Sequence, residues 1–210
     1  VSITLNPLAY SLIQPSERLL RGRPPIWAFL DRQGEVPEGA SKMKHHVVIA
    51  GYGRVGELAG HALLQLNVPF VVIEADLGLA RRLASAGIAT TWGDSATPEV
   101  LHMASVEHAR LLVVAVPDES SSLLTVANAR RIKSDIDIIV RAREAGELEI
   151  LRDLGAREVV VPEFEGGLEM MRQTLLSLGF DSEETLLFAS AVRDIHYGDD
   201  RAGVHGGGGG

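Results

Sequence analysis

Six short runs rich in β-branched residues, separated by stretches of helical periodicity, begin at His45 and constrain the fold of this chain more than any other feature. The predicted strands are residues 46–50, 70–74, 88–91, 111–116, 136–140 and 157–161. The predicted helices between them are residues 54–66, 77–86, 98–104, 119–133 and 144–154. Apolar strands that alternate with helices indicate a parallel sheet covered on both faces. The sequence therefore predicts an α/β fold with a Rossmann-like, doubly wound, parallel six-stranded sheet.

A glycine motif directly follows the first predicted strand. Residues 51–56 read Gly-Tyr-Gly-Arg-Val-Gly and stand where the first helix begins. Gly51 permits a tight turn, Gly53 lets a pyrophosphate approach the backbone, and Gly56 permits close packing of helix on strand. The free amides at the start of the helix attract a phosphate. The motif predicts a nucleotide-binding loop, and the alternative is a glycine turn that serves packing alone.

A carboxylate at the end of the second predicted strand supports nucleotide binding. Glu74 stands 18 residues after Gly56, where an acidic side chain can accept hydrogen bonds from ribose hydroxyls. This carboxylate would also repel a 2′-phosphate, and residues 75–80 include no arginine that could bind one. We therefore expect NAD or an adenosine nucleotide as the ligand rather than NADP.

Two further segments are expected near this ligand, at the carboxyl ends of the third and fifth strands. In the first, residues 93–95, Asp94 either accepts a hydrogen bond from the adenine amino group or caps the following helix. In the second, Arg141 and Arg143 close the fifth strand, where one of them either neutralises a phosphate or forms a surface ion pair with Glu144 or Glu147.

Composition narrows the possible functions. Lys and Arg number 20 against 28 Asp and Glu, so a nucleic acid or an anionic membrane surface is not expected as a partner. The absence of cysteine excludes thiolate metal sites and cysteine nucleophiles. The histidines show no metal-ligand spacing and are expected on the surface or as caps, and the serines at 120–122 are expected to cap or line a helix start. We therefore expect no catalytic residue and no metal site.

The two ends of the chain differ from the centre. Residues 1–13 are largely apolar and three arginines follow, which is typical either of the cytoplasmic end of a membrane helix or of a helix packed on the domain. The next residues, rich in proline and glycine, resemble a linker. Residues 164–178 form a predicted amphipathic helix with Leu168, Met171, Leu175 and Leu178 on one stripe. A short apolar stretch around Leu187 and a five-glycine tail complete the chain.

A resemblance to a known family runs through residues 45–180. Its signature segments are VVIAGYGRVGELAG, VPFVVIEAD, TTWGDSATPEVL and LRDLGAREVVVPEFEGG. They resemble the regulatory RCK or TrkA-N domain of potassium transport proteins, and most closely its version in the Kef-type, YbaL-like members of the monovalent cation:proton antiporter-2 family. Residues 2–8 (SITLNPL) resemble the end of the last membrane helix of these antiporters.

The resemblance implies a domain order and a role. The implied segments are residues 1–20 (end of the last membrane helix and its cytoplasmic flank), 21–44 (linker), 45–162 (nucleotide-binding domain), 163–180 (crossover helix for dimerisation) and 181–210 (C-terminal extension with a glycine-rich tail). The implied protein is a homodimeric antiporter of the inner membrane that carries this domain on its cytoplasmic side. The domain would bind AMP or NAD(H), and occupancy would gate potassium:proton exchange. The alternatives are a small NAD-dependent oxidoreductase whose substrate layer is supplied by a partner, and an assembly module with an empty cleft.

The resemblance also implies the ligand contacts. The residues placed at the nucleotide are Gly51, Tyr52, Gly53, Arg54, Val55, Gly56, Glu74, Ala75, Asp76, Gly93, Asp94, Ser95, Ala115 and Arg141. Among them, the glycine loop and Arg141 would bind phosphates, Glu74 the ribose, and Asp94 with Ser95 the adenine. Ser95 stands where alanine is common in the family, and Glu74 replaces the more frequent aspartate.

Overall fold

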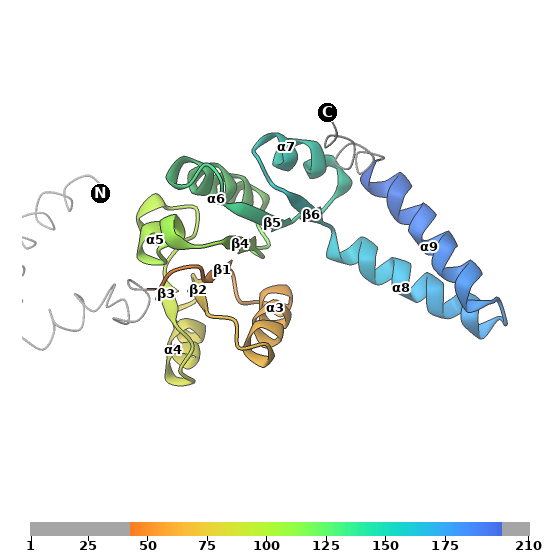
Figure 1. Ribbon diagram of the computed structural model, residues 1–210, viewed down its shortest axis with the longest axis horizontal. Helices are drawn as coiled ribbons and strands as arrows, with labels where there is room; N and C mark the ends of the chain where they lie inside the picture. The colour runs from red at the N-terminus through yellow and green to blue at the C-terminus, as the bar shows by residue number, and fades with distance from the viewer. Residues whose placement is uncertain (1–42, 199–210) are drawn as a thin grey trace, which may run out of the picture.

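The computed structural model describes residues 43–198, and a six-stranded parallel sheet lies at its centre (Figure 1). The strands are β1 (Val47–Ala50), β2 (Phe70–Glu74), β3 (Thr90–Trp92), β4 (Leu111–Val114), β5 (Asp137–Arg141) and β6 (Glu158–Val160). Their order across the sheet is β3-β2-β1-β4-β5-β6, and every neighbouring pair is parallel. This arrangement confirms the predicted doubly wound, Rossmann-like sheet.

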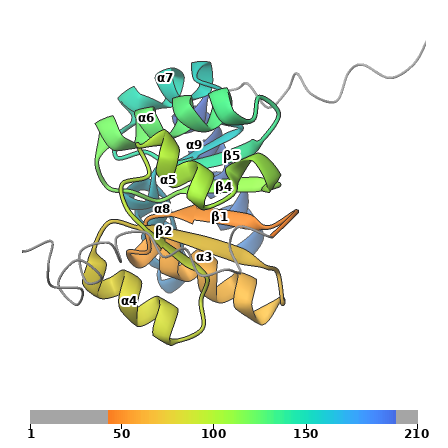
Figure 2. The ribbon, with the colours of Figure 1, turned by 90° about the vertical axis from the view of Figure 1, so that its left-hand side faces the viewer.

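Helices cover both faces of the sheet. Among residues 43–198, five helices do so: α3 (Arg54–Gln65), α4 (Leu77–Ser85), α5 (Pro98–Met103), α6 (Glu119–Ile132) and α7 (Leu148–Asp153). The described residues also form α8 (Pro162–Ser177), α9 (Ser182–Tyr197) and the 3₁₀ turns η2 (Val106–His108) and η3 (Ala145–Glu147). Figure 2 shows α3 and α4 on one side of the sheet and α5, α6 and α7 on the other. The predicted helices agree with these bounds, except that residues 144–154 divide into η3 and α7 and that α9 was not predicted.

Alternate residues of β1 enter two separate cores. Val47 and Ile49 pack in one core with residues of α3 and α4. Val48 and Ala50 pack in the other core with residues of α5, α6 and α7. All four side chains are fully buried, as expected for a central strand of a sheet covered on both faces. The central strand is therefore fixed from both sides, which gives the loop after Ala50 a rigid support.

His46 does not lie on the surface, and this corrects one expectation from the sequence. Neither it nor His45 belongs to a strand, because β1 begins at Val47. The His46 side chain is buried, its Nε2 lies 3.0 Å from the carbonyl oxygen of Ala104, and its Nδ1 has no partner among the described residues. Burial lowers the pKa of His46, and the bond to Ala104 opposes that effect. The domain therefore favours the neutral ring at the base of its central strand.

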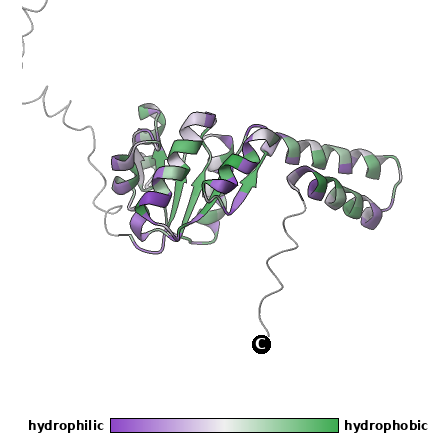
Figure 3. Cartoon of the chain, turned by 90° about the horizontal axis from the view of Figure 1, so that it is seen from above, coloured by the Kyte–Doolittle hydropathy of each residue, from purple (hydrophilic) through white to green (hydrophobic). Residues whose placement is uncertain are grey.

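Helices α8 and α9 form a hairpin that extends away from the sheet (Figures 1 and 3). Helix α9 packs along α8. On the predicted stripe of α8, Leu168 is buried and Met171 and Leu175 are partly buried, whereas Leu178 is 70% exposed. Helix α9 thus covers part of the apolar face of α8, which the resemblance implies to be the face that meets a second copy of the chain.

The predictions for the two ends of the chain fall outside the described residues. They concern the membrane-helix end, most of the linker and the glycine-rich tail. Within residues 43–198, no helix has both the length and the apolar character needed to cross a membrane.

Candidate functional site

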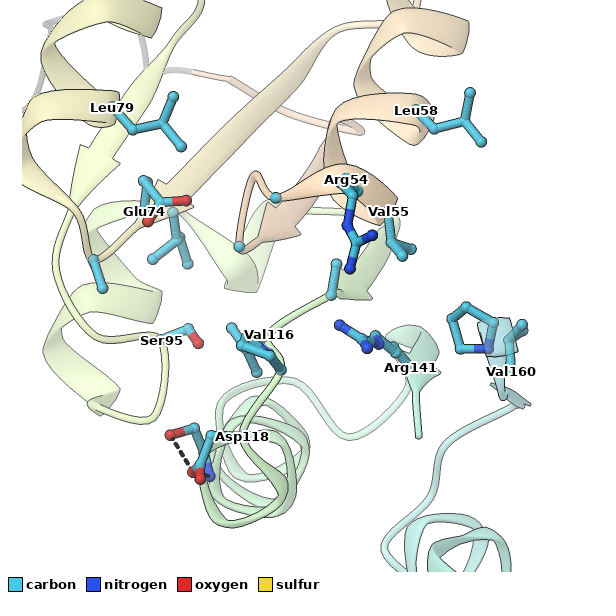
Figure 4. A pocket seen from close by; sticks show the side chains of 18 of the residues that line it. Arg54, Val55, Leu58, Glu74, Leu79, Ser95, Val116, Asp118, Arg141 and Val160 are labelled. Carbon is cyan, nitrogen blue, oxygen red and sulfur yellow. Dashed lines mark hydrogen bonds between the residues drawn. The ribbon is translucent and has the colours of Figure 1, made fainter. Parts of the chain in front are cut away.

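A cleft of about 990 Å³ opens at the carboxyl ends of the strands (Figure 4). It lies over β1 and β4, where the chain turns to helices on opposite faces of the sheet. Open α/β sheets bind ligands at this switch point, and a cleft of this size is at the upper end of the range for small-molecule sites, about 300–1,000 Å³.

The cleft brings together most of the residues that the sequence places at the nucleotide. Those that line it are Gly51, Gly53, Arg54, Val55, Glu74, Ala75, Gly93, Asp94, Ser95, Ala115 and Arg141. They come from the ends of five strands that are far apart in the sequence. A single surface therefore joins the glycine loop, the acid of β2, the loop after β3 and the arginine of β5.

Three of the predicted residues do not line the cleft. Tyr52 is 6% exposed, its ring packs in the core beside Gly60 of α3, and its hydroxyl has no partner among the described residues. Gly56 lies in the first turn of α3, where it packs against Gly51 and against Ile49 of β1. Asp76 caps α4, since its Oδ1 accepts a hydrogen bond of 2.6 Å from the Leu79 amide. These three residues therefore pack below the cleft or cap a helix beside it.

The glycine loop has the geometry that its sequence predicts. Gly51 has a φ of +88°, which favours glycine, and a Cβ on Gly56 would lie 2.0 Å from the Gly51 carbonyl oxygen. Gly53 is the N-cap of α3, so no side chain caps this helix, and a Cβ there would meet nothing within 4 Å. The first amides of α3 are thus open to an anion in the cleft, where the helix dipole adds positive potential.

Glu74 is held beside this loop by two backbone hydrogen bonds. Its Oε2 accepts from the Tyr52 amide at 2.8 Å, and its Oε1 accepts from the Asp76 amide at 2.9 Å. A carboxylate oxygen has two lone pairs, so each oxygen keeps acceptor capacity for a ligand hydroxyl. The acid is therefore preorganised at the end of β2, next to the amides that could bind a phosphate.

The loop after β3 is fixed on α6. Ser95 is buried, and its Oγ lies 3.0 Å from the Thr125 Oγ1, while Asn128 donates to the Ala96 carbonyl oxygen at 2.8 Å. Asp94 accepts from the Ala96 amide at 2.9 Å, and the N-cap of α5 is Thr97. The alternative that Asp94 caps this helix is therefore wrong, and its exposed carboxylate faces the cleft.

Two arginines extend into the same part of the cleft from opposite sides (Figure 4). Arg54 begins α3, and no hydrogen bond or ion pair joins its side chain to another described residue. Arg141 ends β5, and its Nη2 donates to Glu163 Oε1 at 3.1 Å. The suggested surface pairing of Arg141 with Glu144 or Glu147 is wrong, because those two acids form a capping box at η3. The cleft thus brings two guanidinium groups close to each other.

Ten residues of the lining were not expected from the sequence. They are Leu58, Ile73, Leu79, Val116, Pro117, Asp118, Val160, Pro162, Glu163 and Glu165. Leu58 and Leu79 come from α3 and α4, outside the loops that the sequence places at the ligand. Asp118 caps α6 and accepts from the Ser121 amide and hydroxyl at 2.8 and 2.9 Å, which lowers the pKa of Asp118. Asp118 therefore supplies the cap, and Ser121 lines the cleft beside the helix start, which is the other role expected of the serines at 120–122.

The chain is similar to a known domain family and to bacterial antiporters. Residues 47–162 match the TrkA-N domain family. Over 136 residues the chain is 33% identical to the putative K⁺ efflux antiporter KefB of Alkalimonas amylolytica, covering 65% of this chain and 21% of the relative. Over 167 residues it is 30% identical to the putative cation/proton antiporter YbaL of Escherichia coli, covering 79% of this chain and 29% of the relative. The chain thus spans less than a third of the length of these antiporters.

Solved structures give the same relationship. The TrkA-N domain of the inner membrane protein ybaL from Escherichia coli is 33% identical, with a TM-score of 0.60 over 66% of this chain and 99% of that domain. Two further structures share the fold. The Shewanella denitrificans Kef C-terminal domain in its AMP-bound form is 22% identical, with a TM-score of 0.62 over 76% of this chain and 95% of that domain. The GsuK channel bound to NAD is 23% identical, with a TM-score of 0.54 over 64% of this chain and 23% of that channel. The chain belongs to the TrkA-N domain family and is related to the Kef and YbaL cation:proton antiporters.

Proposed function

We propose that this chain is the nucleotide-sensing regulatory part of a monovalent cation:proton antiporter and that its cleft binds AMP or NAD(H). One observation carries the proposal: the uncapped start of α3 and the fixed carboxylate of Glu74 share one cleft. The helix start would receive a phosphate, and Glu74 would accept hydrogen bonds from the ribose. The relatives named as antiporters support a transport domain in the same polypeptide, with this part on the cytoplasmic side of the inner membrane.

The shape of the cleft supports both ligand classes. Glu74, Asp94 and Ser95 lie on the side of β2 and β3, where the adenosine of either ligand would bind. Val160 and Pro162 lie on the side of β6 and α8, where the second nucleoside of a dinucleotide would bind. The AMP-bound Kef domain and the NAD-bound GsuK channel support one class each. We propose a regulatory role rather than an enzymatic one, in which ligand affinity differs between two states of the antiporter.

Substitution of Glu74 tests the ligand site. In Glu74→Ala, calorimetric titration with AMP and with NAD is expected to give affinities about 10- to 100-fold lower, because hydrogen bonds to a charged group contribute about 1.5–3 kcal/mol. Wild-type chain should bind NADP more weakly than NAD, and this difference should shrink in the variant, because a carboxylate that repels the 2′-phosphate has been removed.

Two controls accompany this measurement. Glu169→Ala removes an exposed carboxylate of α8 that pairs with Arg172 outside the cleft, and it should leave both affinities unchanged. Glu74→Gln keeps the shape of the side chain and should show a smaller loss than the alanine variant. Equal affinities in wild type and Glu74→Ala, with both chains folded, would remove Glu74 from the site.

We further propose that the chain forms a homodimer through the α8–α9 hairpin. Its large apolar side chains that are more than half exposed are Met170, Leu178, Phe180, Leu186, Leu187, Phe188 and Ile195. Apolar groups gathered on one projecting element are typical of a protein interface, and a homodimer buries the same patch on both copies (Figure 3).

Sedimentation equilibrium tests the dimer. Leu187→Glu places a charge at a position that is 67% exposed on the hairpin, and it should raise the dimer dissociation constant at least about tenfold, because burying an unpaired charge is costly. Leu66→Glu makes the same change at a position that is 72% exposed at the end of α3, and it should leave the dimer intact. A monomeric wild-type chain, or equal constants for both variants, would contradict the proposed interface.

A further inference from the structure

Arg141 is shared between the cleft and helix α8. Its side chain is 17% exposed and lines the cleft, and its Nε is buried without a partner among the described residues. Its Nη2 donates to the carboxylate of Glu163, the second residue of α8, which is 62% exposed. The guanidinium therefore has one partner from the protein and further donors that this partner does not satisfy.

The charges around Arg141 make its partner exchangeable. Arg54 extends into the same space and repels it, whereas Glu163 and Glu165 bring two negative charges to the α8 side of the cleft. A phosphate bound between the two arginines would be attracted by both and repelled by both acids. Guanidinium groups bind carboxylates and phosphates through the same fork of donors, so the two anions compete for one group.

We propose that Glu163 is an internal competitor of ligand phosphate, and that Arg141 exchanges the Glu163 carboxylate for a phosphate oxygen when a nucleoside diphosphate or a dinucleotide binds. This inference rests on the proposed nucleotide site. Glu163 then sets the affinity of the cleft for phosphorylated ligands, and it lowers that affinity because the ligand must first displace it.

The exchange would alter how the hairpin is attached to the sheet. Glu163 stands in the first turn of α8, which is also held by α9: Glu165 accepts from Arg193, with a shortest distance of 2.8 Å, and the Val161 amide donates to the Tyr197 hydroxyl at 3.1 Å. The Arg193 guanidinium also lowers the pKa of Glu165 and keeps it charged. When Arg141 releases Glu163, the first turn of α8 loses an ion pair to β5 and keeps its bonds to α9. A ligand bound in the cleft thereby weakens the attachment of the α8–α9 hairpin to the sheet.

Calorimetry of the whole chain with ADP and with adenosine tests the competition. Glu163→Gln should bind ADP about two- to fivefold more tightly, the range expected for removal of an exposed ion pair, and should bind adenosine with unchanged affinity. Glu169→Gln, a carboxylate of the same helix that pairs with Arg172 outside the cleft, should change neither affinity. In an Arg141→Gln background, ADP should bind more weakly, and Glu163→Gln should then give a clearly smaller gain, because only the direct repulsion between Glu163 and the phosphate is left to remove.

Hydrogen–deuterium exchange tests the release of α8. ADP should raise deuterium uptake at residues 162–168 of the wild-type chain, and Glu163→Gln should show the raised uptake before ADP is added. Wild-type affinity for ADP in Glu163→Gln, an equal gain for adenosine, or protection of residues 162–168 by ADP would each overturn the inference and leave the nucleotide site standing. Failure of adenosine, ADP, AMP and NAD to bind would overturn the proposed function and this inference together.

Discussion

Replacement of Gly53 by aspartate is expected to weaken nucleotide binding at least about 100-fold and to leave the fold intact. Gly53 lines the cleft as the N-cap of α3, in an extended conformation that any residue can adopt (φ −74°, ψ −168°), and a Cβ there meets no atom within 4 Å. Aspartate is among the best N-cap residues, so its carboxylate would accept hydrogen bonds from the amides that a phosphate needs. It would also place a negative charge beside the phosphate, which costs several kcal/mol.

The stability of this variant separates loss of the site from loss of the fold. An aspartate N-cap exceeds a glycine N-cap by only a few tenths of a kcal/mol, so the melting temperature of Gly53→Asp should stay the same or rise by about 1 °C. Gly53→Asn is the matched control, because asparagine also caps the helix but carries no charge, and its loss of affinity for AMP and NAD should be clearly smaller. Wild-type affinity in Gly53→Asp would show that the ligand does not bind at the start of α3.

The glycine loop could be predicted from the sequence because its determinants are local. Gly51, Gly53 and Gly56 lie within six residues, and the strand before them and the helix after them have clear periodicities. Glu74 could be placed beside them because parallel strands that follow one another through a helix end at the same edge of the sheet. The fold and the side of the cleft formed by the ends of β1, β2 and β3 therefore follow from short-range patterns combined with one rule of topology.

The other side of the cleft depends on long-range packing. Pro162, Glu163 and Glu165 line it only because α8 leaves the sheet beside β5 and turns its first residues toward Arg141, a contact between residues 22 positions apart. Local patterns offered pairing with Glu144 or Glu147 as the alternative to phosphate binding, but these acids, which are nearer in sequence, cap η3. Proximity in sequence thus favoured the wrong acid.

Helix α9 was missed because its apolar residues do not form one stripe. Leu186, Leu187 and Phe188 are consecutive and all more than half exposed, whereas the buried positions of α9 include Thr185 and Ala189. The face of α9 that packs on α8 has small side chains, and the opposite face carries large apolar ones. A surface helix typically shows the reverse, with one apolar stripe toward the core and polar residues outside. A helix whose apolar residues meet a second chain would have this character, which agrees with the proposed dimer.

Gly56→Ala is expected to have the opposite effect to Gly53→Asp, since it should damage the fold rather than the surface of the cleft. The added Cβ would lie 2.0 Å from the Gly51 carbonyl oxygen, 3.1 Å from its carbonyl carbon and 3.3 Å from the Ile49 Cγ2. Two of these contacts are with backbone, so no side chain can rotate to relieve them. Helix α3 must move away from β1, whose residues are fully buried on both faces and cannot follow.

Thermal and denaturant unfolding should show this cost. Overpacking against a rigid backbone destabilises by about 3 kcal/mol, which corresponds to a fall in melting temperature of roughly 6–12 °C for a chain of this size. Gly167→Ala is the matched control, because Gly167 stands in helix α8 and a Cβ there meets nothing within 4 Å. That substitution should stabilise the chain by about 0.5–1 kcal/mol, since alanine favours helix over glycine. Equal melting temperatures for the two variants would show that α3 does not need the close approach to β1 on which the geometry of the phosphate loop depends.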